Sequence, residues 1–286
     1  MRSDVSQYEL TRPASLQAVL AQLAAEPGRH TPIAGGTELM VALGVGRLAQ
    51  KSLVSIQHLE ELRFIREDEG VLHIGAGTTF TDIRRSRVVA ERLPLLALAA
   101  SWTGSVANQN RGTLGGNICN ASPAADSPPA LLAYEASVTV VSARGERTLP
   151  YSEFHLGYKK TALAADELLL RVSVPFPAAG AKQYLRKVGT RNAQAISKVA
   201  LACVARVEGE TLAGVKIGAA SLADRPVRCF AVEAALEGKT IGEETIKAAR
   251  AAMAAEAKPI DDIRSTAKYR AAVAANLLEE FLRGLL

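Results

Sequence analysis

The segment RGTLGGNICNASPAAD, residues 111–126, places two adjacent glycines between a threonine and an asparagine. A shorter segment, AGGTEL at residues 34–39, also joins a glycine pair to a threonine. Glycine permits positive φ and lets a ligand approach the bare main chain. Turns of this kind direct successive N–H groups into one concavity that suits an anion. Two such segments predict a pyrophosphate held from two sides, and therefore a dinucleotide ligand.

The shorter segment is weak evidence when it is taken alone. Thr37 could simply cap a following helix, which requires no ligand. No Lys-Ser or Lys-Thr pair follows the glycines, so the segment is not a Walker A loop, and its spacing is not the GxGxxG of a Rossmann fold. Its position between an apolar stretch and a helical stretch nevertheless favours anion binding at a strand-to-helix turn.

The longer segment supplies a hydroxyl, open backbone and an amide, on Thr113, Gly115, Gly116 and Asn117. Asn117 has an alternative role as a turn residue that bonds its own backbone. Asp126 could cap the helix that Ser127-Pro128-Pro129 begins, accept from a sugar hydroxyl, or do both. Cys119 is expected to be a small packed thiol rather than a nucleophile, because no histidine lies near it in the sequence.

Composition excludes several classes of protein. The 286 residues are 48% hydrophobic and only 5% aromatic, and the formal charge of +5 is dispersed. The densest basic groups are residues 84–87 and Lys159-Lys160, and they favour a solvated face over an anion site. Without a basic stripe interleaved with aromatics, nucleic-acid binding is not expected.

The cysteines and the apolar runs indicate the compartment. Three cysteines at positions 119, 203 and 229 match no zinc or iron–sulfur ligand spacing, and an odd, sparse count argues against a disulfide scaffold. The first ten residues show no apolar leader, and the apolar run at residues 93–102 is too short to span a bilayer. We therefore predict a cytoplasmic protein with no bound metal and no membrane span.

The chain divides into three predicted units in an α+β fold. Residues 1–56 form a small α/β unit, residues 57–177 a second α+β unit, and residues 181–286 a C-terminal unit of strands followed by helices. Pro175-Phe176-Pro177 marks the second boundary. The four histidines are scattered and no GxSxG motif occurs, so no catalytic residue is predicted. Any reactive atoms would belong to a cofactor.

Taken together, the two glycine segments resemble the FAD-binding medium subunit of the molybdenum hydroxylases, the family of xanthine dehydrogenase and carbon monoxide dehydrogenase. The resemblance covers nearly the whole chain and includes LLLRVSVPFP at residues 168–177 and KVGTRNAQAISKV at residues 187–199. It implies an FAD-binding fold of the vanillyl-alcohol-oxidase type, made of two α+β subdomains, with a C-terminal domain of antiparallel sheet plus helices.

The resemblance also implies the residues of the cofactor site. One side of the pyrophosphate would contact Ala34, Gly35, Gly36 and Thr37, with Pro32, Ile33, Glu38 and Leu39 lining the site. The other side would contact Thr113, Gly116 and Asn117. Asp126 would bind a ribose hydroxyl, Leu169 would lie near the flavin, and Lys187 would lie near its pyrimidine edge.

The positive charge of Lys187 is an independent physical reason to expect it near the flavin. A cation near N1 and the C2 carbonyl would stabilise an anionic reduced flavin and raise its potential. The alternative is an ordinary strand lysine in solvent, as its neighbours Arg186 and Arg191 would allow. Gln194, in the same segment, stays outside the predicted set.

The predicted function is therefore electron transfer within a larger complex. The resemblance implies a large molybdopterin subunit that oxidises the substrate and a small subunit with two [2Fe-2S] clusters that would reduce FAD on this chain. The electrons would then pass to an external acceptor, which is NAD, oxygen or a quinone. The extra cysteine-bearing loop of benzoyl-CoA reductase subunits is absent from the sequence, so no iron is expected here. Alternatives are a flavin-free assembly module of the same fold and a stand-alone FAD oxidoreductase.

Overall fold

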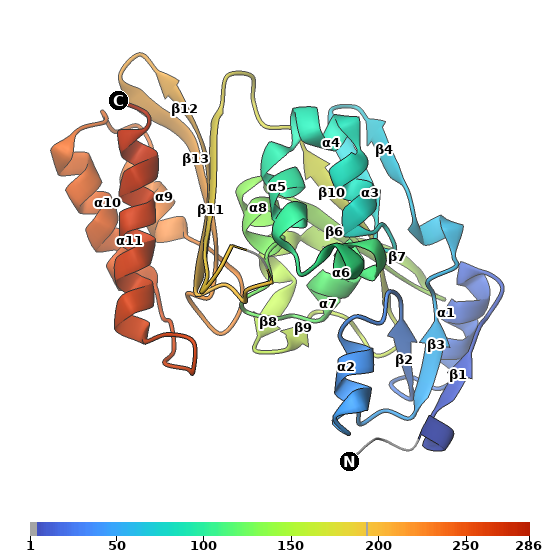
Figure 1. The fold of residues 1–286 in the computed structure, drawn as a ribbon. Coiled ribbons are helices and arrows are strands. Elements are labelled where there is room, and N and C mark those ends of the chain that lie inside the picture. The colour runs from blue at the N-terminus through green and yellow to red at the C-terminus, as the bar shows by residue number, and fades with distance from the viewer. Residues whose placement is uncertain (1–4, 193) are drawn as a thin grey trace.

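A computed structural model describes residues 5–192 and 194–286 of the chain. Figure 1 shows three successive units, with the N-terminal strands at the lower right, a central sheet with its helices, and a C-terminal sheet backed by helices at the left. Within the described residues, no helix is both long enough and apolar enough to cross a membrane.

The N-terminal unit is a three-stranded parallel sheet in the order β1-β3-β2. Ser15 begins the first helix, because its side chain accepts from the Ala18 N–H. The short helix α2 follows the first glycine segment and has no buried residue. The elements are β1 (Glu9–Thr11), α1 (Leu16–Ala25), β2 (His30–Ile33), α2 (Leu39–Gly44) and β3 (Ser52–Ser55).

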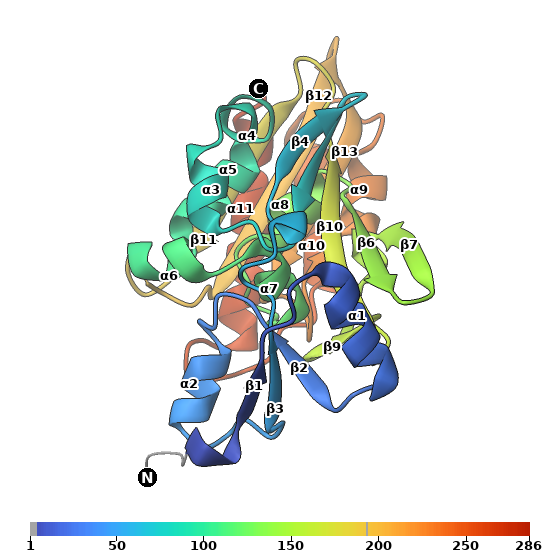
Figure 2. The same cartoon turned by 90° about the vertical axis from the view of Figure 1, so that its right-hand side faces the viewer.

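The central unit is a five-stranded antiparallel sheet in the order β4-β5-β10-β6-β7, with six helices along it (Figure 2). Its strands are β4 (Ile65–Asp68), β5 (Val71–Gly75), β6 (Ser137–Ser142), β7 (Gly145–Pro150) and β10 (Leu168–Pro175). Its helices are α3 (Phe80–Arg85), α4 (Arg87–Arg92), α5 (Pro94–Trp102), α6 (Val106–Arg111), α7 (Leu114–Cys119) and α8 (Pro128–Ala133). A separate hairpin pairs β8 (His155–Gly157) with β9 (Lys160–Thr161).

The turns of this unit follow the sequence closely. The hairpin of β4 and β5 turns at Glu69 and Gly70, which both have the positive φ that a tight hairpin turn requires. Helices α3 and α4 are separate, because Ser86 between them is extended and its side chain accepts from the Val89 N–H to begin α4.

The longer glycine segment is a helix rather than an open loop. It forms the six-residue α7, and Thr113 caps it by accepting from the Gly116 N–H at 3.0 Å. Gly36 has a φ of +74°, but neither Gly115 nor Gly116 has positive φ, so that expectation was wrong for the second segment. Gly115 is required for another reason: an added Cβ would lie 2.6 Å from the Cβ of Ala76. The glycine there permits close packing.

The C-terminal unit is a four-stranded antiparallel sheet with helices on one face. Alternate residues of β12 serve different cores, as the period of a strand requires. Leu201 and Cys203 pack among the C-terminal helices, whereas Ala202 and Val204 join the core of the central unit. The elements are β11 (Lys182–Val188), β12 (Val199–Glu208), β13 (Thr211–Ala220), β14 (Val227–Arg228), α9 (Phe230–Leu236), α10 (Glu243–Glu256) and α11 (Ala267–Arg283).

Helix α8 joins the central unit to the C-terminal sheet. Every residue of α8 is buried, and an added Cβ on Gly218 of β13 would lie 2.2 Å from the Pro129 carbonyl oxygen. The helix backbone therefore rests directly on the strand. The prediction of an α+β fold is confirmed, and the division into units 1–56, 57–177 and 181–286 remains a prediction.

Candidate cofactor site

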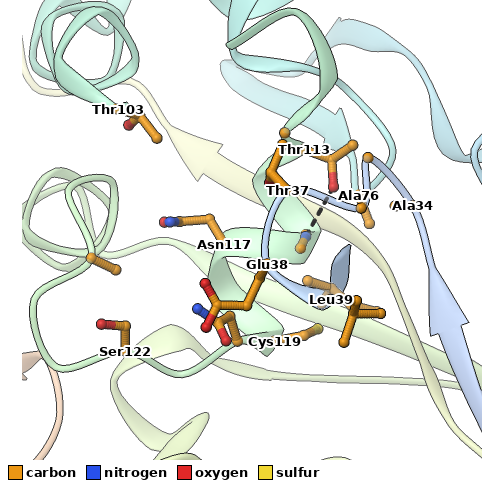
Figure 3. Close-up of a pocket in the computed structure, with 18 of the residues that line it drawn as sticks. Ala34, Thr37, Glu38, Leu39, Ala76, Thr103, Thr113, Asn117, Cys119 and Ser122 are labelled. Atoms are coloured by element: carbon orange, nitrogen blue, oxygen red, sulfur yellow. Dashed lines mark hydrogen bonds between the residues drawn. The ribbon is translucent and has the colours of Figure 1, made fainter. Parts of the chain in front are cut away.

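A cavity of about 970 Å³ lies between the two glycine segments. Its volume lies in the range of about 300–1,000 Å³ that is typical of small-molecule and cofactor sites. Residues from all three units line it, among them Thr37, Thr113 and Gln194. Figure 3 shows Ala34, Thr37, Thr113 and Asn117 around this space.

The first glycine segment, residues 34–39, runs from β2 into the start of α2 and touches the second segment directly. An added Cβ on Gly35 would lie 1.8 Å from the carbonyl oxygen of Arg111, so only glycine fits there. Among the described residues, the backbone N–H groups of Gly35, Gly36 and Thr37 have no hydrogen-bond partner. Because these residues line the cavity, they form a cradle of donors suited to a phosphate. Thr37 does not cap α2, which begins at Leu39 without a side-chain cap.

The second glycine segment uses its backbone donors internally. The N–H groups of Leu114 and Gly115 donate to the carbonyls of Thr78 and Ala76, at 2.9 Å each. What it presents to the cavity is therefore side chains: the Thr113 hydroxyl, which is free to donate, and the Asn117 amide.

The Asn117 side chain is held in place by a neighbour. Its Oδ1 accepts from the Ser127 hydroxyl at 2.6 Å, and this leaves the Nδ2 donors for a ligand. The alternative role of Asn117, a bond to its own backbone, is not the one observed.

Asp126 lines the cavity but does not cap a helix. Ser127 is the residue that flanks α8, and it makes no side-chain cap. The Asp126 Oδ2 accepts from Lys187 Nζ at 2.7 Å, and Oδ1 accepts from the Ser197 hydroxyl at 2.8 Å. Burial raises the pKa of the carboxyl, although Lys187 and Ser197 act in the opposite direction. The helix-cap alternative for Asp126 is therefore wrong.

Lys187 is likewise not a solvent-exposed strand lysine. Only 10% of its side chain is exposed, and its Nζ also donates to the Trp102 carbonyl at 3.2 Å. Lys187 lies on β11, whereas Asp126 precedes α8, so their ion pair connects the C-terminal sheet with the central unit. Ser197 is fully buried and was missed, because nothing in the sequence links it to a carboxylate 71 residues away.

Most of the predicted site residues meet at this cavity. Two described residues of the predicted set, Ile33 and Lys187, lie outside its lining. The residues that do line it are Pro32, Ala34, Gly35, Gly36, Thr37, Glu38, Leu39, Thr113, Gly116, Asn117, Asp126 and Leu169. Their contacts with a cofactor remain predictions.

Other lining residues were missed, and Lys159 is the most informative. The sequence favoured a solvated face for Lys159, but it lines the cavity. Cys119 is exposed along the cavity wall and is not the packed thiol that was expected. Desolvation raises the pKa of its thiol to about 12, which disfavours the thiolate form. In the part of the chain that the structure describes, no three His, Cys, Asp or Glu side chains gather into a metal site.

Comparison with known families defines the class of this fold. Residues 6–177 match the FAD binding domain in molybdopterin dehydrogenase, and residues 184–285 match the CO dehydrogenase flavoprotein C-terminal domain. These two domains together describe a flavoprotein subunit of an oxidoreductase. The chain belongs to the family of FAD-binding medium subunits of the molybdenum hydroxylases.

Named relatives cover nearly the whole chain. The carbon monoxide dehydrogenase medium chain of Hydrogenophaga pseudoflava is 31% identical over 96% of both chains. The putative xanthine dehydrogenase FAD-binding subunit of Escherichia coli (strain K12) is 30% identical over 91% of this chain and 89% of its own. A solved carbon monoxide dehydrogenase from Hydrogenophaga pseudoflava superposes with a TM-score of 0.94 at 32% identity, covering 99% of this chain and 98% of that one. The predicted family, fold and FAD-binding character are thereby confirmed.

Proposed function

We propose that this chain is the electron-transfer subunit of a heteromeric molybdenum hydroxylase. Its partners would be a large molybdopterin subunit and a small subunit with two [2Fe-2S] clusters. When bound, FAD would supply the redox chemistry that links those clusters to an external acceptor, which is NAD, oxygen or a quinone. The three cysteines are free thiols, which favours a reducing compartment such as the cytoplasm.

The observation that carries the proposal is the cradle of unpartnered N–H groups at Gly35, Gly36 and Thr37. A cofactor with a pyrophosphate would receive hydrogen bonds from these groups on one side. The Thr113 hydroxyl and the Asn117 amide would donate from the other side. The backbone contact between Gly35 and Arg111 fixes the distance between the two sides before any ligand arrives.

Asp126 and Lys187 retain capacity for a ligand while they are paired. Each carboxylate oxygen of Asp126 has one partner and a further lone pair, so it could still accept from a ribose hydroxyl. Lys187 Nζ has used two of its three donors. Its positive charge near a flavin pyrimidine edge would favour the anionic reduced form, as predicted. Leu169 would offer the ring an apolar wall from β10.

The test is cofactor content. The purified chain, or the complex with its partners, should show the visible absorption bands of a flavin and release FAD on denaturation. Failure to hold or take up FAD after reconstitution would contradict the proposal and favour the flavin-free assembly module. Co-purification with molybdopterin and iron–sulfur subunits supports the heteromeric complex, whereas full activity in a lone monomer would favour the stand-alone oxidoreductase.

A further inference from the structure

Lys159 links the two sides of the cavity. It occupies the turn between β8 and β9 with a φ of +56°, a left-handed conformation that residues other than glycine, asparagine and aspartate rarely adopt. From this turn, its Nζ lies 2.7 Å from Oδ1 of Asn120 and 3.6 Å from Oε1 of Glu38. Asn120 directly follows α7, and Glu38 belongs to the first glycine segment, directly before α2. All three residues line the cavity.

The charges around the cavity are otherwise matched within the protein. The lining carboxylate Asp126 pairs with Lys187, and the lining carboxylate Glu167 pairs with Arg147. Among the described lining residues, the cationic side chains are Lys159 and Arg264, and Arg264 pairs with Asp262. Lys159 is thus the lining cation that lies beside the glycine segments. The backbone N–H groups of the cradle carry only partial positive charges. Apart from Lys159, no described lining residue beside the glycine segments offers an anionic ligand a full positive charge.

Lys159 also has donors to spare. An ammonium group has three N–H donors, and Asn120 takes one of them. Lys159 Nζ and Glu38 Oε1 form an ion pair, but at 3.6 Å they are too far apart for a hydrogen bond. We propose that Lys159 is a binding residue for the phosphates of the dinucleotide, and that its contacts with Glu38 and Asn120 hold its ammonium group at the cavity wall. This inference rests on the proposed function.

The experiment measures the affinity of the full chain for FAD and for ADP, which shares the pyrophosphate and adenosine but has no flavin. Lys159→Asn removes the charge, and asparagine tolerates the left-handed turn. Lys159→Gly is a second variant that relaxes the turn completely. Lys160→Asn is the matched control on the same hairpin. We expect both Lys159 variants to weaken FAD and ADP binding by about tenfold and to reduce its salt dependence, with the control unchanged.

A double variant separates direct phosphate contact from simple neutralisation of Glu38. If Lys159 binds phosphate, Glu38→Gln combined with Lys159→Asn stays weak. Recovery of wild-type affinity in the double variant would overturn the inference, as would affinity within twofold of wild type in folded Lys159→Asn and Lys159→Gly. If the wild-type chain does not take up FAD, that result contradicts the proposed function. The assignment of Lys159 to phosphate binding then fails as well.

Discussion

The two glycine segments bring similar sequences to one cavity by different means. In the first segment, the backbone N–H groups of residues 35–37 have no partner among the described residues, and the helix α2 that follows has no buried residue. The second spends its N–H groups on Thr78 and Ala76 and sits in the central core, where Leu114 and Ile118 are fully buried. A glycine pair therefore does not define one function: here one pair presents donors, and the other brings a helix close to a strand.

The largest effect of a substitution is expected where the two glycine segments touch. Gly35→Ala would place a Cβ 1.8 Å from the Arg111 carbonyl oxygen and force the two segments apart. We expect a loss of about 3 kcal/mol in the free energy of unfolding, together with the loss of FAD binding. Urea denaturation measures the first effect. Gly44→Ala, where an added Cβ meets no described atom within 4 Å, is the control and should be neutral or slightly stabilising.

The next largest effect is expected at the ion pair of Asp126 and Lys187, which only the second segment has. Lys187→Met would leave a carboxylate that is 12% exposed without its cation, at a cost of about 2 kcal/mol. Asp126→Asn combined with Lys187→Met should cost less than the sum of the two single changes. Strict additivity in urea denaturation would show that the pair carries no coupling. Flavin-bound samples should also show a lower potential in Lys187→Met.

The second glycines of the two pairs should respond differently to substitution. Gly36→Ala is strained by its φ of +74° and should lose about 1 kcal/mol. Gly116→Ala lies in helix α7, where alanine is favoured, and its Cβ would meet only Thr113 Oγ1, at 2.9 Å. Displacement of this cap oxygen should offset the gain in helix propensity, so we expect little net change in unfolding free energy. FAD binding should weaken, because the new methyl group stands at the cavity wall. Equal destabilisation by both changes would contradict this distinction.

The smallest effect concerns pH and the second segment alone. His155 on β8 is buried, and its Nε2 lies 2.9 Å from the Ile118 carbonyl of α7. Burial lowers the pKa of His155 below its ordinary 6.5, so protonation is easier in the unfolded chain. The contribution of neutral His155 to the free energy of unfolding should be fully present above pH 6.5. The free energy of unfolding should fall, by less than about 1 kcal/mol, as the pH drops below 6.5. His155→Gln should flatten this decline in urea midpoints between pH 7 and 5.5, and an unchanged slope would exclude His155 as its cause.

Local signals accounted for much of the fold. The turn at Glu69-Gly70 and the caps at Ser15 and Thr113 depend on neighbours within a few residues, and local chemistry determines them. Helix α7 was taken for a loop because two glycines lower helix propensity, and close packing on Ala76 overrides that preference.

The site could be predicted only in part. The glycine segments supply 17 of the 36 described residues that line the cavity, but the partners of Asp126 lie 61 and 71 residues further along the chain. Lys159 meets Glu38 only after the hairpin of β8 and β9 folds against both segments. Such pairings depend on tertiary distance, which composition and periodicity do not encode.

Helix α8 has a consequence for how the molecule can move. Asp126, in the cavity wall, stands only two residues before this helix, and the helix backbone rests on β13 without a side-chain layer between them. A tilt of the C-terminal sheet must therefore be transmitted to the wall of the cavity. The proline-rich junction at residues 175–177 separates two stretches of sequence, but α8 packs both against β13 and within the core of the central unit.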